Sequence, residues 1–229
     1  MSRPMANDAL LGTNREGRLV TLPTSSRTQG TYVLGKSGMG KSTMLSSMIL
    51  QDIEAGHGVA VFDPKGELVE EILACLPDGH ADRVIYLDAG DPDYAFGLNV
   101  FTCRDTSDPL AVSAAENRVV QTFKKVYSVG QDRAWGYLLE DLLRNVAYTA
   151  FDNQPFTMTE IEPLLTNERY RKRLTGNLGS NSYVAQGFWE HDYPTIVRDQ
   201  RQYRSSTMNK VRAFTHKPMV RTIVGQTET

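Results

Sequence analysis

Residues 31–43 read Thr31-Tyr-Val-Leu-Gly35-Lys-Ser-Gly38-Met-Gly40-Lys41-Ser42-Thr43. A short apolar segment leads into a glycine-rich turn, and the turn leads into residues 42–54, whose apolar positions recur with helical spacing. The pattern Gly, four residues, Gly-Lys-Ser is that of a phosphate-binding loop (P-loop), in which backbone N–H groups form a nest for nucleotide phosphates. We therefore predict a nucleotide site on a strand, a loop and a helix.

The side chains of this loop have distinct predicted roles. Lys41 is expected to reach the terminal phosphates and to act in catalysis, and the Ser42 hydroxyl is expected to bind Mg²⁺. The predicted phosphate-binding set is Gly35, Lys36, Ser37, Gly38, Met39, Gly40, Lys41, Ser42 and Thr43. The alternative is a surface loop that carries Gly-Lys-Ser by chance, and both flanking segments argue against it. A dinucleotide site is excluded because the glycines are not spaced as Gly-X-Gly-X-X-Gly.

A second candidate residue, Asp63, follows the apolar run 59–62 and opens the motif Asp-Pro-Lys-Gly-Glu. Such a run is typical of a buried parallel strand. Ligands of open α/β sheets gather beyond the carboxyl ends of the strands, so Asp63 is a candidate catalytic residue and Mg²⁺ ligand. The pair Asp63-Pro64 is equally typical of a turn at the start of a helix, and both interpretations stay open.

The order of elements predicts an α/β fold. Strands are expected at 32–34, 59–62 and 83–88 with helices between them, so the connections are right-handed parallel crossovers. From residue 109 helical periodicity replaces the strands, and Trp135 and Trp189 are expected to anchor a helical core. Thr157 and Asn167 have the sequence context of helix N-caps.

We predict four parts of the chain from this order. They are an N-terminal hairpin or lead-in at 1–30, the P-loop core at 31–108, an all-α subdomain at 109–220, and the start of a return to the core at 221–229.

Charge is spread unevenly along the 229 residues. The formal net charge is -2, which excludes a polycationic nucleic-acid binder, but residues 168–229 contain 11 Lys or Arg against 5 Asp or Glu. The run Arg169-Tyr-Arg-Lys-Arg173 either touches DNA phosphates or forms a solvated helix face. No apolar run is long enough to span a membrane and the start lacks a signal-peptide core, so we expect a cytoplasmic protein.

Four motifs stand out together: Gly-Lys-Ser-Gly-Met-Gly-Lys-Ser-Thr (35–43), Val-Phe-Asp-Pro-Lys-Gly-Glu-Leu (61–68), Trp-Gly-Tyr-Leu-Leu-Glu-Asp-Leu-Leu-Arg-Asn (135–145) and Leu-Leu-Thr-Asn-Glu-Arg-Tyr-Arg (164–171). The combination resembles the HerA/FtsK superfamily of DNA-pumping ATPases, and more narrowly its conjugative DNA-transfer branch, the type IV secretion coupling proteins. The resemblance implies a RecA-like core with an all-α insertion, a homo-hexamer, ATP with Mg²⁺, and DNA as the moved substrate. Partners in a secretion or transfer complex would place it at the inner face of the membrane.

The sequence departs from this family in one respect. No apolar run followed by Asp-Glu, the Walker B acids of the superfamily, occurs after the helical part. We therefore expect a chain truncated at the C-terminus, which binds nucleotide but by itself lacks the full set of groups for hydrolysis.

Other functions remain as alternatives. A nucleotide-binding docking module that does not hydrolyse ATP is the main one. A GTPase is disfavoured because the sequence has no Asn-Lys-X-Asp element, and a small-molecule kinase has only the P-loop in its favour. An arginine finger is not assigned, and the candidates on a basic face are Arg198, Arg201, Arg204 and Arg212.

Overall fold

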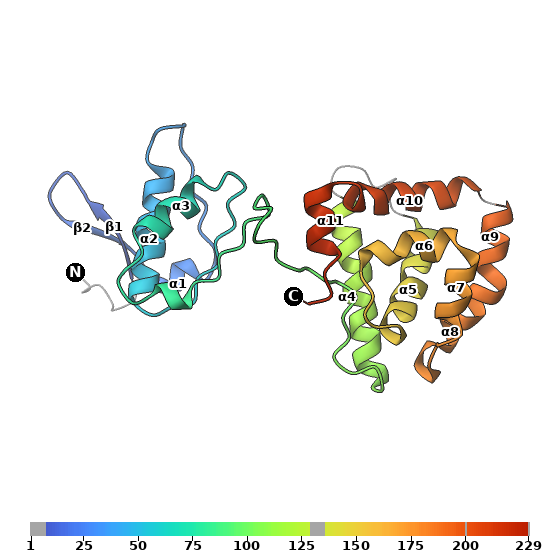
Figure 1. Ribbon diagram of the computed structural model, residues 1–229. Helices are drawn as coiled ribbons and strands as arrows, with labels where there is room; N and C mark the ends of the chain where they lie inside the picture. The colour runs from blue at the N-terminus through green and yellow to red at the C-terminus, as the bar shows by residue number, and fades with distance from the viewer. Residues whose placement is uncertain (1–7, 129–135, 200, 229) are drawn as a thin grey trace. The chain divides into compact units, whose positions relative to one another are not determined.

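The computed structural model describes residues 8–128, 136–199 and 201–228. The chain forms two compact units, residues 1–86 (unit 1) and 87–229 (unit 2), coloured blue to green and green to red in Figure 1. The division falls within the last predicted strand, whereas the predicted helical subdomain starts with the first long helix of unit 2.

Unit 1 combines a β-hairpin with short helices. Its elements are β1 (Ala9–Thr13), β2 (Leu19–Leu22), α1 (Thr24–Arg27), α2 (Lys41–Glu54), α3 (Glu67–Ala74) and the 3-10 turn η1 (Ala81–Arg83). The two strands are antiparallel, Ala9 lies opposite Leu22, and a bulge interrupts the register between Leu10 and Gly12. At the turn the Asn14 side chain accepts the backbone N–H groups of Glu16 and Arg18, as short polar side chains do in turns.

Helix α2 holds the hairpin and α1 through polar contacts. The Leu10 N–H donates to the Gln51 side-chain oxygen at 2.7 Å, and the Gln51 amide donates to the Leu10 carbonyl at 3.0 Å. Arg27 of α1 forms an ion pair with Asp52. Because the described buried apolar residues of unit 1 are Ala9, Met48 and Ile72, its small core is supplemented by these contacts.

The parallel sheet predicted for 32–34, 59–62 and 83–88 is not present. Within the described residues, the sheet is the two-stranded antiparallel one, and the three segments are irregular chain without strand partners. Leu34, Phe62 and Ile85 are 77%, 94% and 86% exposed. A parallel sheet is stable when both of its faces are covered, and the described residues of unit 1 leave these side chains exposed.

In unit 2 the described residues from Pro109 onward form helices and short connections, in line with the all-α character predicted for 109–220, and an irregular segment at 87–108 precedes them. Its elements are α4 (Pro109–Ser128), α5 (Tyr137–Asp152), the 3-10 turn η3 (Met158–Glu160), α6 (Ile161–Thr166), α7 (Glu168–Thr175), the 3-10 turn η4 (Ser180–Ser182), α8 (Tyr183–Gly187), the π-helical turn η5 (Phe188–Asp192), α9 (Tyr193–Asp199), α10 (Arg201–Thr215) and α11 (Pro218–Val224). Helix α10 joins α9 to α11 and contacts α5 and α6 (Figure 1). In the part of the chain that is described, no helix is both long and apolar enough to cross a membrane.

The hydrophobic core of unit 2 surrounds α5. This helix buries side chains from Leu139 to Phe151 and packs against α4 and α8. The ring of Phe101 lies edge-on to Phe156 at 5.5 Å. Trp189 is 5% exposed, which confirms its predicted place in the core, whereas Trp135 lies outside the described residues.

Two predicted helix caps are confirmed in unit 2. Thr157 and Glu160 form a capping box at η3. The Asn167 side chain accepts the N–H of Tyr170 at 3.0 Å and caps α7. Both caps follow from neighbouring residues alone, because a short polar side chain satisfies backbone donors that the first helical turn leaves without partners.

Candidate nucleotide-phosphate site

The glycine loop before α2 has the backbone that its sequence predicts. Gly38 and Gly40 have φ angles of 76° and 77°, in the left-handed region that only glycine adopts without strain. A Cβ at either position would meet open space, so it is the backbone conformation that requires glycine there. Gly40 is also the N-cap residue of α2.

Lys41 is the first residue of α2 and reaches back across the loop. Its ammonium donates to the Lys36 carbonyl at 2.9 Å, and the same carbonyl accepts the Met39 N–H at 3.4 Å. A Cβ at Gly35 would lie 3.5 Å from the Lys41 side chain, so the lysine stem runs close to the start of the loop. The ammonium is thereby held over residues 35–40, where a phosphate oxygen would replace one carbonyl as its partner.

The N-terminus of α2 presents backbone donors to the same loop. Its first helical hydrogen bond runs from the Met44 N–H to the Gly40 carbonyl at 2.9 Å, so the N–H groups of Lys41, Ser42 and Thr43 have no partner within the helix. The first turn contains no acid and no side chain caps it. Ser42 and Thr43 are exposed. The positive end of the helix, one ammonium and two hydroxyls fit nucleotide phosphates and Mg²⁺.

The Asp63 carboxylate accepts backbone hydrogen bonds at the start of α3. It accepts the N–H of Lys65 at 3.0 Å and that of Leu68 at 2.8 Å, and these hydrogen bonds lower the pKa of Asp63. Gly66, at φ 85°, precedes the helix. Within the described part of unit 1, Asp63 makes no hydrogen bond to residues 35–43, so this arrangement matches the turn and helix start. The predicted metal role of Asp63 stays a prediction.

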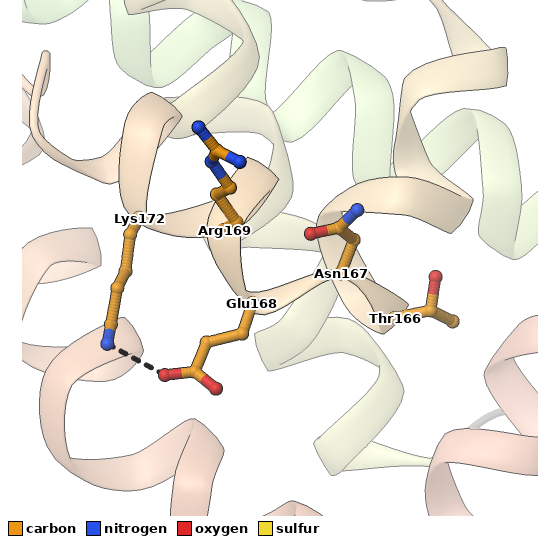
Figure 2. Close-up of a pocket in the computed structure, with 5 residues that line it drawn as sticks. All are labelled: Thr166, Asn167, Glu168, Arg169 and Lys172. Atoms are coloured by element: carbon orange, nitrogen blue, oxygen red, sulfur yellow. Dashed lines mark ion pairs between the residues drawn. The ribbon is translucent and has the colours of Figure 1, made fainter.

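A hollow of about 660 Å³ opens at the start of α7 in unit 2 (Figure 2). Its lining residues are Thr166, Asn167, Glu168, Arg169 and Lys172. The sequence marks the basic run 169–173, but nothing in it predicts that Thr166 and Asn167 line a hollow. No sequence signal marks a hollow, because its walls depend on how α6 meets α7.

No cluster of three or more His, Cys, Asp or Glu side chains that could hold a metal ion occurs in the residues that the structure describes. Ser42 and Asp63 therefore remain the candidate metal ligands from the sequence.

The glycine loop and Asp63 both lie in a segment that is similar to a known protein family. Residues 16–80 match the family model of the type IV secretion-system coupling protein DNA-binding domain. No curated protein and no solved structure matches the chain. The match covers less than half of the chain, and it supports the coupling-protein branch of the resemblance.

Proposed function

We propose that this chain is the ATP-binding portion of a DNA-translocating motor of the conjugative transfer or type IV secretion class, which couples ATP hydrolysis to DNA movement. One observation carries the proposal. The left-handed glycines lead directly into α2 with Lys41 at its first position, and this site lies inside the segment that resembles a coupling-protein domain.

The chain's own groups would act by binding and charge stabilisation. The N–H groups at the start of α2 would receive the phosphate oxygens, and Lys41 would exchange the Lys36 carbonyl for a terminal phosphate. Mg²⁺, held by Ser42 and by Asp63, would neutralise charge on the phosphates. The carboxylate has further lone pairs besides those that accept the N–H groups of Lys65 and Leu68, so Asp63 could approach Mg²⁺ or its water while it still holds the start of α3.

The proposal includes a RecA-like parallel sheet and a homo-hexamer. The sheet is supported by the composition of the apolar segments that contain Leu34, Phe62 and Ile85. These three side chains are exposed, and within the described residues the segments lie outside any sheet, so they would have to pair with one another to form it. The hexamer is supported by the family resemblance alone. The motor would work on the cytoplasmic side, at the inner face of the membrane, through components of the transfer complex.

The proposal is tested first at Lys41. Titration calorimetry with Mg-ATP should show binding to the wild type and a loss of at least tenfold in affinity for Lys41→Ala, because the substitution removes the phosphate counter-charge. Arg83→Ala, which removes one cation from another exposed position of unit 1, is the matched control and should bind like the wild type. Equal affinity of Lys41→Ala and the control would refute the P-loop assignment.

A docking module that binds ATP without hydrolysing it is the second candidate. It is favoured by the engagement of the Asp63 carboxylate with the start of α3. Phosphate release with and without DNA separates the two functions, since a motor hydrolyses ATP faster when DNA is present. Asp63→Asn should weaken the Mg²⁺ dependence of ATP binding more than the affinity itself, and ATP binding that is equal with and without Mg²⁺ in the wild type would remove the metal role.

A further inference from the structure

Helix α7 of unit 2 carries four cationic residues and one acid. Arg169, Lys172 and Arg173 are exposed. Lys172 and Arg173 follow Arg169 by three and four residues, so the three cations are neighbours on the exposed surface of the helix. This exposed set lies outside the segment that resembles the coupling-protein domain.

Arg171, the fourth cation, has a different environment. It is half-buried, its guanidinium donates to the Leu164 carbonyl at 3.0 Å, and it lies 4.8 Å from the centroid of the Tyr193 ring. Tyr193 and Leu174 are buried. Arg171 therefore anchors the inner side of α7 to α6 and α9, whereas Arg169, Lys172 and Arg173 are exposed and Arg173 lies over the aromatic ring of Tyr170.

The hollow at the start of α7 offers donors to an anion. Hydroxyl, carboxamide, guanidinium and ammonium groups line it. Figure 2 shows that Arg169 and Asn167 extend to one side of the helix, and Lys172 and Glu168 to another, so the two cations can reach separate phosphates. Glu168 pairs with Lys172 at 2.7 Å, but both side chains are largely exposed, and such pairs are easily exchanged for another anion.

We propose that α7 is a DNA-contacting surface of unit 2, which binds the phosphate backbone through Arg169, Lys172 and Arg173 without reading the bases. Cationic side chains and amides on an exposed helix supply contacts to phosphates, which position DNA but carry no sequence information. The neighbouring aromatic ring, Tyr170, is covered by the Arg173 guanidinium at 4.9 Å, so it is not presented to a base. The inference rests on the proposed function, because DNA as partner comes from the similarity of residues 16–80.

The test compares the salt dependence of DNA binding among full-chain variants. A random-sequence duplex is titrated with the wild type, with the triple variant Arg169→Gln, Lys172→Gln, Arg173→Gln, and with the control Arg104→Gln, Lys125→Gln, Arg221→Gln. The control removes the same charge from other exposed positions of unit 2. Each phosphate contact contributes about 0.9 to the slope of log K against log salt, so the α7 variant should lose about 2 to 3 from this slope and the control less than about 1.

Arg171→Gln distinguishes a phosphate contact from an anchor. This substitution should lower the melting temperature and leave the salt slope equal to that of the wild type, because the Arg171 guanidinium faces Leu164 and Tyr193. Equal losses of slope in the α7 variant and the control, or a full slope in the α7 variant, would overturn the proposal.

Mg-ATP binding, measured on the same proteins, keeps this proposal separate from the nucleotide site. DNA binding with a full salt slope in the α7 variant would overturn the α7 surface alone. A wild type that binds Mg-ATP but no DNA would overturn the α7 surface and the DNA motor, and would leave the nucleotide site standing. A wild type that binds neither would overturn both proposals.

Discussion

The backbone N–H of Leu98 donates a hydrogen bond of 2.9 Å to the carbonyl of Ile223. The Gln226 amide also donates to the Ala95 carbonyl at 3.2 Å. The segment that leads into the helices of unit 2 therefore lies beside the end of α11 and the residues that follow it. Since two distant parts of the chain are joined here, the contact closes the helical unit on itself.

Gly97 should be sensitive to substitution because of this contact. A Cβ at Gly97 would overlap the Glu228 carbonyl oxygen, which forces the C-terminal segment to move. We expect Gly97→Ala to lower the free energy of unfolding by about 1–3 kcal/mol and to speed hydrogen exchange at Leu98. Gly187→Ala, where the added Cβ meets open space, should be neutral or stabilising. Wild-type protection of Leu98 in Gly97→Ala would contradict this prediction.

Thr149→Val should destabilise unit 2, although the valine side chain has nearly the same shape as the threonine side chain. The Trp189 indole N–H donates to the Thr149 hydroxyl at 2.8 Å, and Thr149 is 0% exposed. Loss of the acceptor leaves a buried donor without a partner, at a cost of about 1–3 kcal/mol in urea denaturation. The exposed Thr195 provides the control, since Thr195→Val should change stability by less than about 0.5 kcal/mol. Equal stabilities of the two variants would show that the indole finds another partner.

Glu116 should make the stability of unit 2 depend on pH. It is 2% exposed, and burial raises its pKa despite the Arg144 guanidinium at 2.7 Å. The folded state then binds the proton more tightly than the unfolded state, so stability falls as the pH rises from the unfolded pKa toward the folded one. Glu116→Gln should remove this part of the decline as the pH rises above about 4.5 in urea denaturation. Curves that stay parallel to the wild type would contradict the assignment.

Asp63 should have the opposite pH dependence. Its folded pKa is lowered by hydrogen bonds from Lys65 and Leu68, so its stabilisation of α3 is present above the unfolded pKa and is lost as the pH falls through the folded one. Asp63→Asn should speed hydrogen exchange at Leu68 near neutral pH, and its difference from the wild type should shrink below about pH 4. The exposed Asp78 provides the control in Asp78→Asn. A difference that is independent of pH would rule out the charge of Asp63 as its source.

The helix after the glycine loop was predictable to within one residue, and the parallel sheet was not. The helix predicted at 42–54 is α2 at Lys41–Glu54, because glycine before it and apolar periodicity along it act locally. The strands predicted at 32–34, 59–62 and 83–88 depend on non-local partners, and hydrophobicity alone did not supply them. A strand has no hydrogen bonds of its own, so an apolar run is a strand only where another pairs with it.

In the candidate site, too, the features that depend on near neighbours were predictable and the others were not. Gly38, Gly40 and Lys41 are placed as the loop pattern predicts, because a left-handed glycine and a helix start involve only near neighbours. For Asp63 the sequence supported two roles, and its hydrogen bonds to Lys65 and Leu68 match one of them.

Near neighbours therefore account for the helix caps, the left-handed glycines and the phosphate-loop pattern, since each of these depends on residues within one turn of chain. Packing between distant segments accounts for the rest. Four cations of α7 look alike in the sequence, yet Arg171 lies against Tyr193 and Arg169 faces solvent. Burial of Glu116 beside Arg144 and the meeting of Leu98 with Ile223 likewise arise only when the helices assemble, because side-chain burial is a property of contacts that no local pattern contains.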